Sequence, residues 1–267
     1  AVDVVTPDGS TLVVSEFNYR PHDPFLPGEI AVSTDRDDYE YIELLNTGSS
    51  TLSLDGVRFE DGIFFEFPPL TFLEPGGRIL AVANLAAFTE RYGGLIGSTP
   101  IAGEFTGSLS NNGERVLLTG PLGIIRDFIY SDQLPWPTSA DGDGPSLVLI
   151  APFSVPQHSD AFNWRTSISV GGAPGASDSL TFAEWKAARG ILDDDGDPDF
   201  DGLNNFGEFA VGTEFDSPNN SKFFQLHRVA FGADLHLGLN IRLSLAAMDD
   251  VSMTINGSPG LGNWTDV

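Results

Sequence analysis

Short apolar segments separated by turn signals make up most of the first 175 residues. The turn signals are clusters of glycine, asparagine, aspartate and proline, such as "NTGSS", "LEPGG", "SNNGE" and "DGDGP". Several segments alternate polar and apolar residues, as strands do when one face is buried. Many short strands at near-regular spacing are typical of an antiparallel β-sandwich, so we expect a mainly β fold. The expected strands span residues 11–17, 39–45, 50–60, 62–67, 77–83, 114–120, 123–130 and 146–152.

One helix is expected between these strands, and the apolar positions of the strands predict the core. The segment "NLAAFTERYGG" (84–94) places Asn84 as the N-cap, and Gly93 and Gly94 as the stop. The residues expected in the core are Val14, Ile42, Leu44, Phe59, Phe67, Ile79, Leu117, Ile125 and Leu147.

The charge balance restricts the partners that the chain can bind. It has 13 basic and 38 acidic side chains and a formal net charge of -25. Such a field repels phosphate backbones and attracts divalent cations, so we expect no nucleic-acid partner. The absence of cysteine excludes disulfides, thiolate catalysis and cysteine-ligated metals. No apolar run approaches the ~20 residues of a membrane helix, so membrane insertion is not expected.

The pattern changes after the small-residue stretch "GGAPGASDS" (171–179), which reads as a linker. Residues 180–190 predict a helix, with Thr181 and Glu184 as a capping box and Gly190 as its end. A second short helix is expected to end at Gly212, and strand patterns return from Lys222. We therefore expect a β-sandwich over 1–178, a helix–loop–helix segment over 179–221 and a partial C-terminal β domain over 222–267.

The stretch "DPDFDGLNNFGE" between these helices fits the loop pattern of an EF-hand. Asp197, Asp199 and Asp201 occupy positions 1, 3 and 5, and Gly202 permits the turn at position 6. The Leu203 carbonyl stands at position 7, Asn205 at 9 and Glu208 at 12, where a glutamate binds with both oxygens. Because Ca²⁺ takes six to eight oxygen ligands at ~2.3–2.6 Å, each element of the spacing has a coordination role. A second Ca²⁺ site through Asp193, Asp195 and Asp197 is conceivable, and an acidic solvated linker is the alternative.

Other groups of residues are weaker candidates for a catalytic or binding site. Glu16 and Glu43 lie inside strand patterns, and a buried carboxylate pair would suggest glycosidase chemistry. Alternation of faces along strands makes exposed edges the expected setting for both. Trp136, Trp164 and Tyr19 could stack on sugars, but core packing is more common for such residues in a sandwich. The four histidines show no zinc-ligand spacing, and no nucleophile or phosphate-binding motif is present.

Residues 12–175 resemble the lamin-tail domain family as it occurs in secreted bacterial proteins. That family has an immunoglobulin-like β-sandwich fold and accompanies surface and extracellular proteins, with no catalytic residues assigned. The resemblance therefore implies a fold and an extracellular setting. It rests on "VVSEFNYRP" (13–21), "DYEYIELLNTGSSTLSLDGVRFEDGI" (38–63), "FLEPGGRILAVAN" (72–84), "GSLSNNGERVLLTGPLGIIRDFIYSD" (107–132), "WPTSADGDGPSLVLIAP" (136–152) and "NWRTSISVGGAPG" (163–175).

Residues 180–221 resemble an EF-hand-like or thrombospondin-type-3-like calcium-loop segment of large secreted planctomycete and verrucomicrobial proteins. The counterparts here are Trp185, the run Asp193–Asp201, "DGLNN" (201–205) and "GTEFDSP" (212–218), the last with an insertion. Together these features favour a non-enzymatic, secreted or cell-surface module that binds Ca²⁺ and serves a structural or adhesion role. The alternative is a carbohydrate-binding accessory module of a polysaccharide-degrading enzyme.

Overall fold

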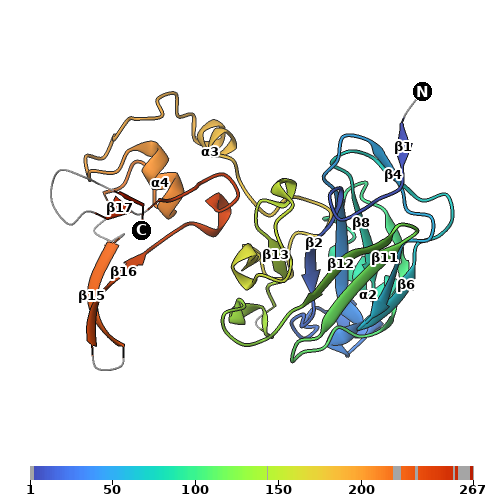
Figure 1. Cartoon of the computed structure of the whole chain (residues 1–267). Helices are drawn as coiled ribbons and strands as arrows, with labels where there is room; N and C mark the ends of the chain where they lie inside the picture. The colour runs from blue at the N-terminus through green and yellow to red at the C-terminus, as the bar shows by residue number, and fades with distance from the viewer. Residues whose placement is uncertain are drawn as a thin grey trace. The chain divides into compact units, whose positions relative to one another are not determined.

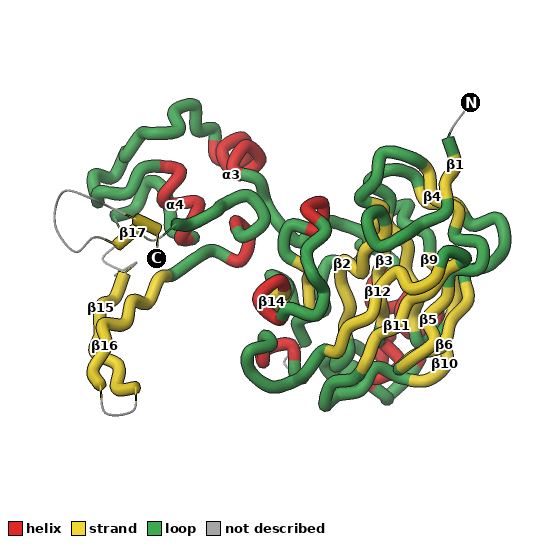
Figure 2. The backbone as a smooth tube through the Cα atoms, in the orientation of Figure 1, coloured by secondary structure: helices red, strands yellow, loops and turns green. Residues whose placement is uncertain are grey.

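Two compact units, Ala1–Asp178 and Ser179–Val267, make up the computed structural model of the chain (Figure 1). The structure describes residues 3–142, 144–218, 224–231, 234–254, 256–257 and 265–266. Strands dominate unit 1, and its helices are short (Figure 2). Among the described residues, no helix combines the length and apolar character that crossing a bilayer requires.

Unit 1 is built on two larger sheets and one small one. In the six-stranded sheet the order is β14 (Trp164–Thr166), β13 (Leu147–Leu149), β2 (Leu12–Asn18), β3 (Tyr41–Asn46), β8 (Arg78–Val82) and β9 (Ile101–Glu104). In the five-stranded sheet it is β10 (Thr106–Gly107), β6 (Ile63–Glu66), β5 (Arg58–Asp61), β11 (Arg115–Gly120) and β12 (Gly123–Ile129). The small sheet contains β1 (Val4–Val5), β4 (Thr51–Ser53) and β7 (Phe72–Leu73).

One hydrophobic core takes its side chains from both larger sheets, which is consistent with a β-sandwich. From the first sheet come Phe17, Ile42 and Leu44, and from the second Phe59 and Leu118, all of them buried. Most neighbouring strands are antiparallel; the pairs β1–β4 and β8–β9 are parallel. The prediction of a mainly β fold is therefore confirmed.

Every residue of β2 and β3 is buried, because both faces of the sheet are covered there. Successive strand side chains point to opposite faces. Ile42 of β3 belongs to the main core, whereas its neighbour Tyr41 packs in a second cluster with Phe88 and Tyr92 of α2 (Leu85–Tyr92). Asn84 caps α2 by accepting from the amides of Ala86 and Ala87, as the sequence predicts.

Several elements of unit 1 were not predicted from the sequence. The helix α1 (Pro27–Val32) and the 3₁₀ helices η1 (Arg36–Tyr39), η2 (Thr138–Ala140), η3 (Pro152–Ser154) and η4 (Ala161–Asn163) are too short for a helical period to register. The expected single strand over 50–60 is two strands, β4 and β5, which belong to different sheets. A turn at Gly56, with φ of 73°, divides them.

The core prediction is wrong for one residue, Leu117. Eight of the nine expected side chains belong to the main core, but Leu117 is only half-buried. Its neighbours Val116 and Leu118 occupy the core instead. An error of one residue in strand phase transfers a side chain to the opposite face, and that is what separates the prediction from the structure here.

The described part of unit 2 contains two α-helices, one 3₁₀ helix, a β-hairpin and short strands. Its helices are α3 (Phe182–Arg189), α4 (Asn205–Val211) and the 3₁₀ helix η5 (Leu245–Ala247). Its strands are β15 (Phe224–Phe231), β16 (Asp234–Ile241), β17 (Asn256–Gly257) and β18 (Thr265–Asp266). The capping box of α3 and its end at Gly190 match the prediction, as does the end of α4 at Gly212. A separate C-terminal domain beginning at residue 222 stays a prediction, and part of it lies outside the described residues.

The core assignment predicts a contrast between two leucines. Leu44→Ala removes a fully buried side chain and should lower the free energy of unfolding of unit 1 by ~2–5 kcal/mol. Leu117→Ala, at a half-buried position, should lower it by less. Denaturant unfolding followed by the fluorescence of the buried Trp136 and Trp164 measures both. Equal losses in the two variants would contradict this account of the core.

Candidate metal site

The acidic loop lies between two helices that pack on each other. The indole of Trp185 on α3 and the ring of Phe209 on α4 have centroids 5.8 Å apart, and Phe182 lies 5.4 Å from Phe209. These rings and Ala247 form the small core of unit 2. The packing fixes both ends of the loop, so the loop spans a set distance.

The loop then closes onto the start of α4. The Asn204 side chain caps this helix by accepting from the amide of Gly207 at 2.8 Å. The amide of Asn205 donates to the Gly196 carbonyl at 2.8 Å. As a result, the first turn of α4 lies against the middle of the acidic run, and Glu208, which belongs to this turn, is only 1% exposed.

Three aspartates of the loop converge. Asp197, Asp199 and Asp201 each offer a carboxylate oxygen, and these oxygens lie within 4.8 Å of one another. Backbone hydrogen bonds hold the carboxylates in place. Asp197 Oδ2 accepts from the amide of Gly202 at 3.1 Å, Asp199 Oδ1 from that of Asp201 at 3.2 Å, and Asp201 Oδ1 from that of Leu203 at 2.9 Å.

Five further oxygens at this site are buried and have no hydrogen-bond partner. They are Asp197 Oδ1, Asp199 Oδ2, Asn205 Oδ1 and both carboxylate oxygens of Glu208. The amide nitrogen of Asn205 donates to the Asp193 carbonyl at 2.7 Å, which leaves its oxygen for another partner. Because buried polar groups are almost always satisfied, a group of unsatisfied oxygens is an arrangement that a positive ligand would satisfy.

The electrostatics of Glu208 point the same way. Burial raises the pKa of Glu208 to about 7, and the three loop aspartates add to the rise. The nearby Thr213 hydroxyl lowers the pKa of Glu208 and so offsets part of this rise, although it makes no hydrogen bond to Glu208. Burial also raises the pKa of Asp199. The site thus disfavours its own negative charge, and a bound cation would reverse that.

Of the six residues expected to bind the cation, the structure brings together Asp197, Asp199 and Asp201. Asn205 and Glu208 have buried side-chain oxygens without a hydrogen-bond partner, and their roles as ligands stay predictions. The role of the Leu203 carbonyl stays a prediction.

The second site proposed over Asp193, Asp195 and Asp197 also stays a prediction. Asp193 and Asp195 are exposed. One Asp193 oxygen accepts from the Asp195 amide at 3.1 Å, and one Asp195 oxygen accepts from Asn204 at 3.3 Å. Among the described residues, only the group of Asp197, Asp199 and Asp201 has three acidic side chains close enough to share an ion.

Glu16 and Glu43 differ from their expected setting. They were expected on exposed edges, but they are 2% and 0% exposed and lie opposite each other on β2 and β3. A bulge between Val14 and Glu16 shifts the register, which brings the two carboxylates to the same face of the sheet. Sequence alternation alone could not reveal this, because a bulge reverses the phase of the strand.

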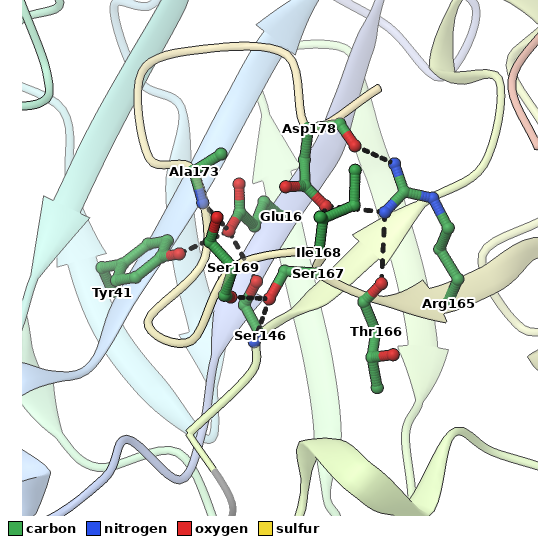
Figure 3. Close-up of polar contacts among 10 residues, drawn as sticks. All are labelled: Glu16, Tyr41, Ser146, Arg165, Thr166, Ser167, Ile168, Ser169, Ala173 and Asp178. Atoms are coloured by element: carbon green, nitrogen blue, oxygen red, sulfur yellow. Dashed lines mark hydrogen bonds and ion pairs between the residues drawn. The ribbon is translucent and has the colours of Figure 1, made fainter. Parts of the chain in front are cut away.

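These two carboxylates bind the chain that leaves the sandwich, and Figure 3 shows the contacts of Glu16. Glu16 Oε1 accepts from the Ser146 hydroxyl at 2.6 Å, the Tyr41 hydroxyl at 2.5 Å and the Ala173 amide at 2.9 Å. Glu43 Oε2 accepts from the Gly175 amide at 2.6 Å, and Glu43 Oε1 pairs with Arg78. The stretch 171–179 was expected as a linker, but its residues 171–178 are part of unit 1.

Two further features secure this segment, which we call the return segment (residues 171–178). At Gly172, φ is 88°, and an added Cβ would lie 2.0 Å from the Tyr41 hydroxyl and 2.1 Å from Glu16 Oε1, so only glycine fits. The buried guanidinium of Arg165 donates to the Asp178 carboxylate and to the Asp178 carbonyl, each at 2.7 Å.

Comparisons with protein-family models, with curated proteins and with solved structures give no match to this chain.

The buried pair predicts a pH dependence of stability. Burial and the charge of Glu43 raise the pKa of Glu16 to about 7, from 4.5 in the unfolded chain. The folded state therefore binds more protons than the unfolded state between these values, and the contribution of Glu16 to stability falls as pH rises through about 7. Glu16→Gln keeps the acceptor oxygen and removes the charge. Unfolding free energies from pH 4.5 to 8 should fall less steeply in this variant than in the wild type.

The exposed Glu66→Gln serves as the control for this comparison. The pH dependence of its unfolding free energy should follow that of the wild type. The other titrating groups are present in both chains, so their contributions cancel when the two profiles are subtracted. A Glu16→Gln profile parallel to the wild type would show that Glu16 does not titrate in this range.

Proposed function

We propose that this chain is a non-enzymatic, calcium-binding structural or adhesion module of a secreted or cell-surface bacterial protein. The observation that carries the proposal is the group of buried, unpartnered oxygens in the acidic loop of unit 2. The extracellular setting and the immunoglobulin-like, lamin-tail type of the sandwich rest on the sequence resemblance, and the two sheets around one core support the latter.

Calcium is the cation that fits these ligands best. The proposed ligands are Asp197, Asp199, Asp201, the Leu203 carbonyl, Asn205 and Glu208. All are oxygens, and none is a thiolate or imidazole, which suits a hard cation rather than zinc or copper. Glu208, with both oxygens unpartnered, would supply two ligands from the helix that follows the loop.

The ion would act on the stability of unit 2. The described core of this unit centres on Trp185, Phe209 and Ala247, so it buries little apolar surface. A cation held by the loop and by Glu208 would join the loop to α4 and neutralise the repulsion among the carboxylates. Calcium would thus order the segment that follows the sandwich, which suits an extracellular spacer.

The carboxylates and aromatic residues of unit 1 support a binding or structural role over hydrolysis. Glu16 and Glu43 are buried under the return segment and hydrogen-bonded, so they cannot contact a substrate. Trp136, Trp164 and Tyr19 are buried in the core, as expected, and offer no stacking platform for sugars. The carbohydrate-binding alternative therefore gains no support from these three residues.

The calcium proposal predicts one ion bound at the loop with a Kd of ~10⁻⁵–10⁻³ M. This range runs from the weakest calcium sensors to extracellular calcium-binding modules. At a hundredfold excess over Kd the ion should stabilise unit 2 by ~2.7 kcal/mol. Hydrogen exchange of residues 182–211, with calcium and with a chelator, measures the effect locally. Glu208→Gln should abolish most of the calcium-induced protection, and Asn205→Ala should reduce it less.

Glu214→Gln, an exposed glutamate beyond α4, is the matched control and should behave as the wild type. Equal protection with and without millimolar calcium in the intact chain would refute the proposal for this loop.

A further inference from the structure

Phe200, at the centre of the acidic loop, has a backbone conformation that phenylalanine rarely adopts. Its φ is 61°, in the left-handed region, where an L-residue brings its Cβ close to the following carbonyl oxygen. Glycine has no Cβ and adopts this region without that cost, as Gly202 does two residues on with a φ of 96°. A bulky residue with such a φ calls for a physical explanation.

Packing of the side chain does not explain this conformation. The side chain of Phe200 is 88% exposed, so it buries little apolar surface in return for the strained backbone. A rare backbone conformation persists only where the surrounding structure imposes it, and such residues are concentrated at binding sites. The explanation must therefore lie in the residues on either side of Phe200.

The residues on either side are proposed calcium ligands. Phe200 lies between Asp199 and Asp201, whose carboxylate oxygens converge with one of Asp197 within 4.8 Å. The amide of Asp201 donates to Asp199 Oδ1 at 3.2 Å, and that of Gly202 donates to Asp197 Oδ2 at 3.1 Å. In an extended chain, by contrast, alternate residues lie ~6.6 Å apart along a line. The left-handed residue thus belongs to the curled form of the loop, in which the carboxylates converge.

The curled form is unfavourable for the loop without a cation. The converged carboxylates repel one another, and Asp197 Oδ1 and Asp199 Oδ2 are buried without a hydrogen-bond partner. The left-handed Phe200 adds a conformational cost to this electrostatic one. A cation would offset the repulsion, but part of its binding free energy would also be needed to hold Phe200 in the left-handed region.

We infer that Phe200, which is not itself a ligand, sets the calcium affinity of the acidic loop. The curled form that surrounds the ion requires a left-handed residue at position 200, and phenylalanine makes that form scarce in the ion-free chain. The ion therefore binds more weakly than it would to the same loop with glycine at this position. The inference rests on the calcium proposal above, and it makes the order of unit 2 respond to the calcium concentration.

The test is the calcium Kd of the full chain, measured by titration calorimetry for a series of substitutions at position 200. Phe200→Gly should lower the Kd ~5-fold, because loss of the left-handed cost outweighs the greater freedom of glycine in the ion-free loop. Phe200→Asn should lower it by less, since asparagine tolerates this conformation better than most residues. Phe200→Ala removes the ring but keeps the Cβ, so its Kd should equal that of the wild type. A variant that merely fails to fold cannot gain affinity.

Leu70 provides the matched control. It is also an exposed apolar residue with a left-handed φ, at 75% exposure and 62°, but it belongs to unit 1. Leu70→Gly removes the same backbone cost outside the loop, so it should leave the calcium Kd unchanged. Hydrogen exchange of the Asp201 and Gly202 amides reports locally on the curled form. In Phe200→Gly, their half-maximal protection should occur at a ~5-fold lower calcium concentration than in the wild type.

Three results would overturn the inference. Equal calcium Kd values in the wild type and in Phe200→Gly would leave the calcium proposal intact and show that the loop keeps its left-handed residue without the ion. An equal gain of affinity in Phe200→Ala would show that the exposed ring, and not the backbone, limits binding. No calcium uptake by the wild type or by Phe200→Gly would refute the calcium proposal, and this inference with it.

Discussion

The pairing of β2 with β3 is the contact on which the rest of unit 1 depends. Both strands are buried along their whole length at the middle of the six-stranded sheet. One face supplies Phe17, Ile42 and Leu44 to the core. The opposite face supplies Glu16 and Glu43, which bind the return segment, and Tyr41, which packs on α2. A single strand pair thus organises the apolar interior and the polar attachment of the chain exit.

The chain has to bury acids with few bases available, and the structure shows two ways in which it does so. Some carboxylates pair with buried arginines, as Glu29 does with Arg91 and Asp178 with Arg165. Glu16 instead receives hydroxyl and amide donors. With 13 basic against 38 acidic side chains, arginine cannot compensate them all. For the carboxylates of the acidic loop that remain buried without a partner, we propose a metal ion as the counter-charge.

Local signals in the sequence were enough to locate most strands, the caps of α2 and α3 and the convergence of the loop aspartates. Each rests on chemistry within a few residues: apolar alternation, a capping box, or the spacing of an ion-binding loop. The errors share a different origin. The bulge beside Glu16, the phase of Leu117 and the division of 50–60 between two sheets depend on how distant strands register, which no short window contains.

The attachment of Asp178 has a mechanical consequence. Asp178 is the last residue of unit 1, and Ser179 begins unit 2. Because Arg165 holds both the carboxylate and the carbonyl of Asp178, no slack chain separates this anchor from the next unit. Tension that enters unit 1 from its carboxyl end is therefore borne first by the Arg165 guanidinium and the Ile168 amide, which both bind Asp178, and next by the short strand β14 to which Arg165 belongs. A pulled chain would begin to open at this edge of the sheet, while the β2–β3 pair at its centre still held.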